Sequence, residues 1–256
     1  MTNARYILAA FLIMSVVVLA SCSQGQEVRQ QGPAVPDISN PSALHYFDYH
    51  SIILDKTTAI GLEIKNLNLY LDMYGTLTVL GEVQNTSALV KSNIAITLDF
   101  FDNQQKLLFS TEYPGQVKYL LPGNSLPFCL YVDQKDKYID IARVKAGVNY
   151  QDYHSQFKGN PVLQQEKYYY QGDYLIIEGQ LINLGQAEVK DLLLLCTFYN
   201  QMDKVVFVKK CYLPRTSLGP RARQKFELKL LLDTYLPEFT HHRFSVFFKD
   251  AIGGEA

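Results

Sequence analysis

The sequence lacks the short motifs that mark the commonest catalytic sites. Its 256 residues contain no Gly-x-Ser-x-Gly, no His-Glu-x-x-His, no Walker loop and no Gly-x-Gly-x-x-Gly. A site assembled from scattered residues would leave no such local pattern, but a motif-bearing enzyme is excluded. Sustained apolar stripes with a period of 3.6 residues are also missing, which argues against long amphipathic helices. We therefore expect a non-enzymatic protein built mainly from strands.

Positive charge is neither abundant nor clustered in the sequence. The chain has 24 lysine and arginine residues against 25 aspartate and glutamate residues, for a net charge of −1 at pH 7. Nucleic-acid binding depends on neutralising phosphates with basic side chains, so no nucleic-acid partner is expected. No linear run of lysine or arginine marks a membrane-binding patch in the folded part.

Cysteine is scarce, tryptophan is absent, and no Cys-x-x-Cys pair occurs. Three of the four cysteines, Cys129, Cys196 and Cys211, lie in the second half of the chain, and an odd number cannot all pair. A hairpin turn at 200–203 would place Cys196 opposite Phe207, leaving Cys211 too far away for a disulfide. We expect three free, mostly buried thiols. A Cys196–Cys211 bridge is the alternative.

Four acidic and histidine residues are weak candidates for metal ligands. Asp48 and His50 would point the same way on a strand, as would Asp152 and His154. A structural zinc site usually has four protein ligands, and the sequence supplies no further ones nearby. Solvated or hydrogen-bonded histidines at a domain junction are the simpler interpretation. No metal or cofactor is therefore expected.

The N-terminal segment resembles the signal of a bacterial lipoprotein. Arg5 precedes an apolar run, Tyr6–Leu19, whose length of about 14 residues is too short to span a bilayer, which needs roughly 20. The run ends in Leu-Ala-Ser-Cys, which is similar to the lipobox of that family. The resemblance implies that residues 1–21 are removed and that Cys22 becomes an acylated N-terminus.

The residues after Cys22 refine the expected location. Ser23, rather than aspartate, follows the cysteine, and in enterobacterial lipoproteins this resembles the outer-membrane class. We expect a protein anchored in the bacterial cell envelope through lipidated Cys22. The outer membrane is favoured over the inner membrane as its location. Residues 22–43 are rich in Gln, Pro, Gly and Ser and form a flexible tether, with an average reach of about 25 Å.

The rest of the sequence repeats itself at a spacing of 98 residues without a gap. Gly81–Asn85 aligns with Gly179–Asn183, and Leu98–Asp102 aligns with Cys196–Asn200. Identity is low, but the spacing of apolar residues is the same in both copies. The pattern predicts a duplicated domain.

Within each copy the hydrophobic period is two. Ile94, Ile96, Leu98 and Phe100 alternate with smaller or polar residues, and residues 77–83 show the same alternation. Alternation of this length predicts half-buried strands, and several short strands in each copy favour an antiparallel β-sandwich. We expect an all-β chain with two tandem sandwiches, at residues 44–150 and 151–256.

The order of these features resembles the FxLYD domain. A Gly-x-Val-x-Asn strand is followed by a strand that ends aromatic-aromatic-Asp, then by Leu-x-Pro-Gly and a phenylalanine strand. The name motif would fall on Leu98–Asp102 and Cys196–Asn200, although both lack the leading Phe. In the second copy Gly219–Arg221 replaces Leu121–Gly123. The resemblance implies immunoglobulin-like sandwiches of the bacterial envelope and carries no catalytic residues.

One sheet of the second copy is expected to be apolar on both faces. Its outer face is predicted to contain Leu193, Leu195, Tyr199, Val206 and Val208. Large apolar surfaces mark contacts. Packing against the first domain, or against segment 52–70, is one explanation; a protein partner or self-association is the other, which makes these five residues a candidate partner surface.

Together these features predict a lipid-anchored, non-enzymatic envelope protein that binds a protein partner or acts as a scaffold. Such a protein would use a sheet face or an unpaired strand edge. The alternatives are a small-ligand or metal-binding envelope module, and an accessory subunit of an envelope enzyme.

Overall fold

A computed structural model describes residues 48–72, 74–232 and 237–250. The expected signal peptide, Cys22 and the tether lie outside these residues. All described elements belong to one compact unit. No helix among the described residues is long and apolar enough to cross a membrane.

The described residues form strands and two short 3-10 helices, which confirms the predicted all-β class. The elements are η1 (Tyr49–Ser51), β1 (Ile53–Lys56), β2 (Leu62–Leu71), β3 (Leu77–Asn85), β4 (Val90–Phe101), β5 (Leu107–Pro114), β6 (Tyr119–Leu120), β7 (Ser125–Val132), η2 (Lys135–Asp140), β8 (Arg143–Tyr153), β9 (Pro161–Gln171), β10 (Tyr174–Asn183), β11 (Val189–Tyr199), β12 (Val205–Lys210), β13 (Arg223–Leu231) and β14 (His241–Asp250).

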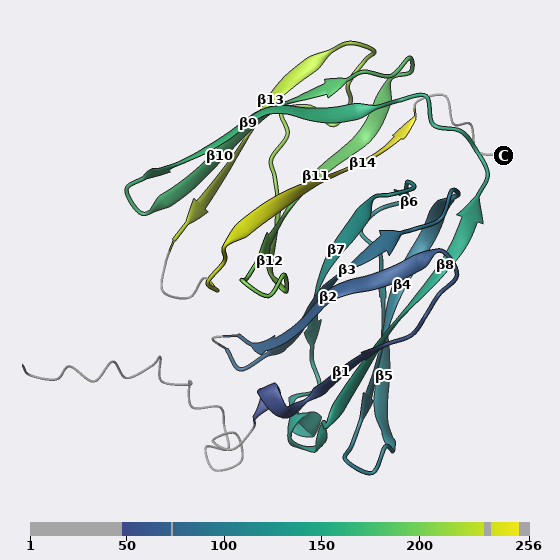
Figure 1. The fold of residues 1–256 in the computed structure, drawn as a ribbon, viewed down its shortest axis with the longest axis vertical. Coiled ribbons are helices and arrows are strands. Elements are labelled where there is room, and N and C mark those ends of the chain that lie inside the picture. Colours follow the sequence, from purple (N-terminus) through teal and green to yellow (C-terminus); the bar gives the residue numbers. More distant parts are fainter. Residues whose placement is uncertain (1–47, 73, 233–236, 251–256) are drawn as a thin grey trace, which may run out of the picture. The chain divides into compact units, whose positions relative to one another are not determined.

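The strands form four sheets (Figure 1). Sheet A has the order β1-β8-β4-β5, with β6 also paired to β4, and sheet B has the order β2-β3-β7. Sheet C has the order β13-β10-β9, and sheet D has the order β12-β11-β14. All named pairs are antiparallel except β1 and β8, which run parallel. The short strand β1 is thus a departure from the purely antiparallel arrangement expected.

Two hydrophobic cores hold these sheets together in pairs. Sheets A and B enclose the first core, in which Ile96, Leu98 and Phe100 of β4 are buried as the alternation predicts. Sheets C and D enclose the second core, in which Leu194 and Phe198 of β11 are buried. Each pair of sheets is therefore a β-sandwich with its own interior.

The two sandwiches share local structure at the spacing of the sequence repeat. Asn85 and Asn183 each donate their side-chain amide to two backbone carbonyls, 4 and 35 residues further along the chain. Asp102 and Asn200 each accept from the backbone N–H groups 2 and 4 residues further along. These side chains close equivalent turns, so Asn200 replaces Asp102 without losing the contacts.

The loop Gly219–Arg221, which departs from the FxLYD-like sequence pattern, has the same backbone conformation as Leu121–Gly123 at its last residue. Gly123 has a φ of +79°, and Arg221, its counterpart 98 residues later, has a φ of +62°. This left-handed conformation suits glycine and strains other residues. The second copy therefore retains the turn although its sequence no longer favours it.

Strand β8 continues past the expected domain boundary at residue 150 and ends at Tyr153. A linker then leads to β9, and its backbone N–H groups at Lys158 and Gly159 donate to the carboxylate of Asp250. Phe157 of the linker packs edge-on against Phe248 and Tyr119. The linker is thus attached to β14 and to the β6 segment rather than free.

Sheets B and D also pack on each other through their outer faces. Leu80 of β3 forms a small buried cluster with Tyr199 of β11 and Val205 of β12. As a result Thr78 and Glu82, on the same face as Leu80, are buried as well. The prediction that β3 is half-buried is wrong, because sheet D covers the face that alternation assigns to solvent.

Candidate functional site

The first pair of candidate metal ligands does not lie on a strand. Asp48 is the N-terminal cap of η1, and its carboxylate accepts a hydrogen bond from the backbone N–H of His50 at 3.0 Å. The ring of His50 lies 4.0 Å from that of Tyr49. The expected strand geometry is wrong here, since a capped 3-10 turn satisfies the aspartate locally.

The second pair is separated by the end of β8. Asp152 is on the strand and makes a 2.5 Å ion pair with Lys91, whose side chain is nearly inaccessible to solvent. His154 follows the strand and is exposed. Among the described residues no group of three or more histidine, cysteine, aspartate or glutamate side chains is arranged to hold a metal ion.

The three cysteines are free, as expected. Cys196 and Cys211 are buried in the second core, and burial raises the pKa of both thiols, that of Cys211 to about 12. The predicted hairpin register is wrong, because Cys196 pairs with Lys209 rather than Phe207. The turn extends to Lys204, and the bulge between β11 and β12 that follows it shifts the partner of Cys196.

The five residues of the candidate partner surface lie against other parts of the chain. Leu195 and Tyr199 are each 1% exposed, and Leu195 joins the core enclosed by sheets A and B. Leu193 packs on that same core, and Val208 packs on the cluster around Leu80. This outer face of sheet D is therefore covered by the first sandwich in the described structure.

Val206 lies on the opposite side from that expected. The register between β11 and β12 shifts at Tyr199, which pairs with Val205, whereas Phe198 pairs with Phe207. Val206 is the extra residue of this bulge and is buried in the second core. A bulge of this kind reverses the side on which one side chain points. Val205, not Val206, faces sheet B.

Polar groups lie at the centre of the contact between sheets B and D. The hydroxyl of Tyr199 donates to the buried carboxylate of Glu82 at 2.7 Å, and the amide of Asn66 donates to its other oxygen at 2.7 Å. Burial raises the pKa of Tyr199, and the bond to Glu82 adds to the shift. His241 stacks on the Tyr199 ring at 4.9 Å. The Tyr199–Glu82 bond joins sheet D to sheet B, whereas the Asn66–Glu82 bond lies within sheet B.

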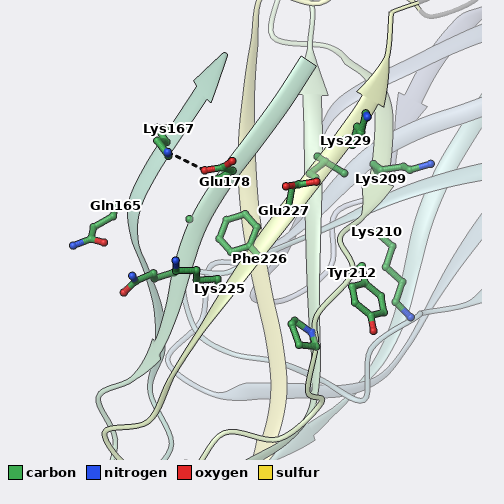
Figure 2. Close-up of a pocket in the computed structure, with 14 residues that line it drawn as sticks. Gln165, Lys167, Glu178, Lys209, Lys210, Tyr212, Lys225, Phe226, Glu227 and Lys229 are labelled. Carbon is green, nitrogen blue, oxygen red and sulfur yellow. Dashed lines mark ion pairs between the residues drawn. The ribbon is translucent and has the colours of Figure 1, made fainter. Parts of the chain in front are cut away.

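A different surface, on the outer face of sheet C, is open to solvent. We call it the lysine trough: an open depression of about 820 Å³. Its exposed side chains include Lys167, Lys209, Lys210, Tyr212, Lys225 and Lys229. Figure 2 shows Lys209, Lys210 and Tyr212 on one side of it and Lys167 with Glu178 on the other.

Local structure explains why these residues meet. Strand β13 alternates strictly, so that Lys225, Glu227 and Lys229 face outward while Phe226 and Leu228 face the core. The chain after β12 crosses to sheet C, where Tyr212 forms an isolated antiparallel bridge with Glu227. This crossing places the end of β12 beside the sheet and makes one wall of the trough.

Positive charge exceeds negative charge in the lysine trough. Its lining contains five lysines and two glutamates, Glu178 and Glu227, a surplus of three positive charges. Glu178 accepts from the hydroxyl of Tyr169 at 2.6 Å and forms an ion pair with Lys167 at 2.9 Å. The Tyr169 bond, followed by Lys167, lowers the pKa of Glu178. One glutamate is thus already neutralised by its neighbours.

The sequence offered only a diffuse signal for the lysine trough. Lys209 and Lys210 are adjacent, and β13 has a charged residue at every second position, but no linear cluster exists. Lys167 belongs to yet another strand. Only the sheet topology and the crossing after β12 bring these side chains onto one surface.

Comparisons with known proteins identify no family for this chain. No family model matches it, and no curated protein does. Among solved structures it is similar to a red sea bream transglutaminase (10% identity, 74% of this chain, 30% of that chain, TM-score 0.22). A second similar structure is that of an Amycolatopsis orientalis exo-chitosanase (11% identity, 73% of this chain, 26% of that chain, TM-score 0.25).

A third solved structure is a tandem CBM22 domain from Paenibacillus barcinonensis Xyn10C, with 9% identity over 75% of this chain and 86% of that chain and a TM-score of 0.15. The chain spans less than a third of the length of the transglutaminase and the chitosanase. The resemblance to FxLYD domains stays a prediction.

Proposed function

We propose that this chain is a lipid-anchored protein of the bacterial envelope that acts without catalysis, as a binding or scaffold module. The N-terminal signal and Cys22 support the anchor. The lysine trough supports binding, and it is the observation that carries the proposal: an open surface with a surplus of positive charge on a sheet whose other face is a packed core.

The packing of the two sandwiches suits this role. Sheet D is attached to the first sandwich through Leu195, which joins its core, and through the Tyr199–Glu82 hydrogen bond. Sheet C lies at the far side of the second core from sheet D, and among the described residues the side chains of Lys167, Lys225 and Lys229 on its outer face are exposed. A rigid element presents a binding surface with less loss of conformational entropy than a mobile one.

Cellular location tests the anchor. A Cys22→Ala variant lacks the acyl attachment site, so it should leave the membrane fraction while keeping the far-ultraviolet circular dichroism of a strand-rich protein. The expected tether, residues 22–43, has no apolar run in its sequence, so stable anchoring would depend on the acyl chains. A Cys22→Ala protein that has lost residues 1–21 and still stays in the membrane fraction after a carbonate wash contradicts the anchor.

Crosslinking in living cells tests the binding surface. A photo-reactive amino acid placed at Tyr212, which is 78% exposed, should form a covalent adduct of higher mass. The matched position is Tyr131, which is 53% exposed but lies on the first sandwich, and it should form none. Equal yields at the two positions, or no adduct at Tyr212, would contradict a function for the lysine trough.

A further inference from the structure

We infer that the lysine trough binds a linear anionic glycan, a chain of sugars that carries carboxylate or phosphate groups. The inference rests on the proposed function, which places the protein in the cell envelope as a binding module. It adds the chemical class of the ligand. Charge, shape and the kinds of side chain present each support it.

Most ammonium groups of the lysine trough have no carboxylate partner. Among the ion pairs of the described residues, Lys167 is the only trough lysine that takes part. Lys229 lies 4.1 Å above the ring of Tyr174, and Lys209, Lys210 and Lys225 form no ion pair within the described chain. A surface that carries more positive than negative charge favours an anionic ligand.

The trough's shape suits an extended chain. It is an open depression, with sheet C as its floor and the crossing at Tyr212 as one wall. Sites for small ligands are usually enclosed on most sides, and this one is not. A planar membrane surface would meet the projecting wall before it met the floor. An extended polymer can follow the floor beside that wall.

The residue types favour a glycan over a protein. Lysine is depleted in the interfaces of protein complexes, whereas five lysines line this surface. Tyr212 lies among them with 78% of its surface exposed, and an exposed tyrosine offers an apolar ring face together with a polar tip. Sugar rings have matching apolar C–H faces between their polar groups. Ammonium groups and a bare aromatic ring together fit a charged sugar chain.

The first sandwich shows that these charges are not a requirement of the fold. The residues equivalent to Glu178 and Glu227, 98 positions earlier, are Leu80 and Cys129, which pack against sheet D. The outer face of sheet B thus serves packing within the chain. Its counterpart on sheet C carries charge instead and is exposed in the described part of the chain.

Binding to defined polymers tests the inference on the full-length protein in a non-ionic detergent. The probe is polygalacturonate, a linear glycan with a carboxylate on every sugar; polyglutamate is the acidic polypeptide of comparable charge, and dextran is the neutral glycan. Polygalacturonate should bind, with an affinity that falls about tenfold or more between about 50 and about 200 mM sodium chloride. Dextran should not bind, and polyglutamate should bind about tenfold more weakly.

Two sets of variants assign the binding to the surface. Changing Lys209, Lys210 and Lys225 to glutamine should weaken polygalacturonate binding about tenfold or more and flatten its salt dependence. The control changes Lys106 and Lys190, exposed lysines outside the trough, to glutamine and should bind as the wild type does. Tyr212→Ala should weaken binding several-fold with the salt dependence unchanged, because it removes a ring and no charge.

Several outcomes would overturn the inference. These are no binding of polygalacturonate at the lower salt concentration, equal binding of polyglutamate, and a triple variant that binds like its control. An adduct at Tyr212 in cells without binding of polygalacturonate would refute the glycan and leave the proposed function standing. If neither an adduct at Tyr212 nor binding of polygalacturonate is found, the glycan inference and the proposed binding function are both refuted.

Discussion

The hydroxyl of Tyr199 donates a 2.7 Å hydrogen bond to the carboxylate of Glu82, a residue 117 positions earlier in the chain. The bond joins sheet D of the second sandwich to sheet B of the first. Both residues are 1% exposed, so neither can turn to water for an alternative partner. The attachment of the two sandwiches therefore depends on specific polar contacts as well as on apolar area.

The first prediction concerns this bond. Tyr199→Phe should lower the free energy of unfolding by about 1.5–3 kcal/mol, because a buried carboxylate loses one of its donors. Urea denaturation followed by fluorescence measures the change. The matched control is Tyr212→Phe at an exposed position, where a change within about 0.5 kcal/mol is expected. Equal stability of the two variants would show that the Tyr199 bond contributes nothing.

The second prediction concerns the apolar part of the same contact. Leu195→Ala should destabilise the protein by about 2–5 kcal/mol, because truncation leaves a cavity where sheet D meets the first core. Leu231→Ala, at a leucine that is 45% exposed, is the control and should cost much less. If Leu195 served only an external partner, its truncation would leave the denaturation midpoint unchanged.

Local pattern was sufficient to predict strands β3 and β4. Ile96, Leu98 and Phe100 are buried on one face of β4, because a strand that covers one core needs an apolar residue at every second position. Alternation could not predict the burial of Thr78 and Glu82, since that depends on a second sheet from a distant part of the chain. The side of Val206 was missed because a bulge leaves no signature in composition.

The candidate site shows the same limit. A surface made from β9, β10, β13 and the end of β12 takes its lysines from three separated segments. Lys167 and Lys225 lie on the two outer strands of sheet C, with β10 between them. Their proximity is a property of strand order, which the sequence pattern does not specify.

The third prediction uses the repeat as its own control. Asn183→Ala should lower the free energy of unfolding by about 2 kcal/mol or more, because two buried carbonyl groups lose their donor. Asn85→Ala should have a similar effect, since its amide makes the equivalent pair of bonds in the first sandwich. Thermal and urea denaturation of both variants measures this. A large effect at one asparagine and none at the other would contradict their structural equivalence.

The fourth prediction concerns alkaline pH. Burial raises the pKa of Cys211 from 9.0 to about 12 and also raises that of Cys196. Above pH 9 the unfolded chain loses these thiol protons while the folded chain keeps them, so ionisation favours the unfolded state. Stability should therefore be constant with respect to these groups below pH 9 and should fall as the pH rises toward 12, by about 1.4 kcal/mol per pH unit for each thiol.

Urea denaturation between about pH 8 and about pH 11 measures this slope, with a reductant present to keep the thiols free. Cys211→Ala removes one of the two groups, so its stability should decline less steeply than that of the wild type, even if the variant is less stable at neutral pH. The raised pKa of Tyr199 adds a decline of the same sign above pH 10, and this part should persist in Cys211→Ala. Identical slopes for the variant and the wild type would mean that Cys211 ionises as readily in the folded protein as in the unfolded chain, which its burial in the second core does not allow.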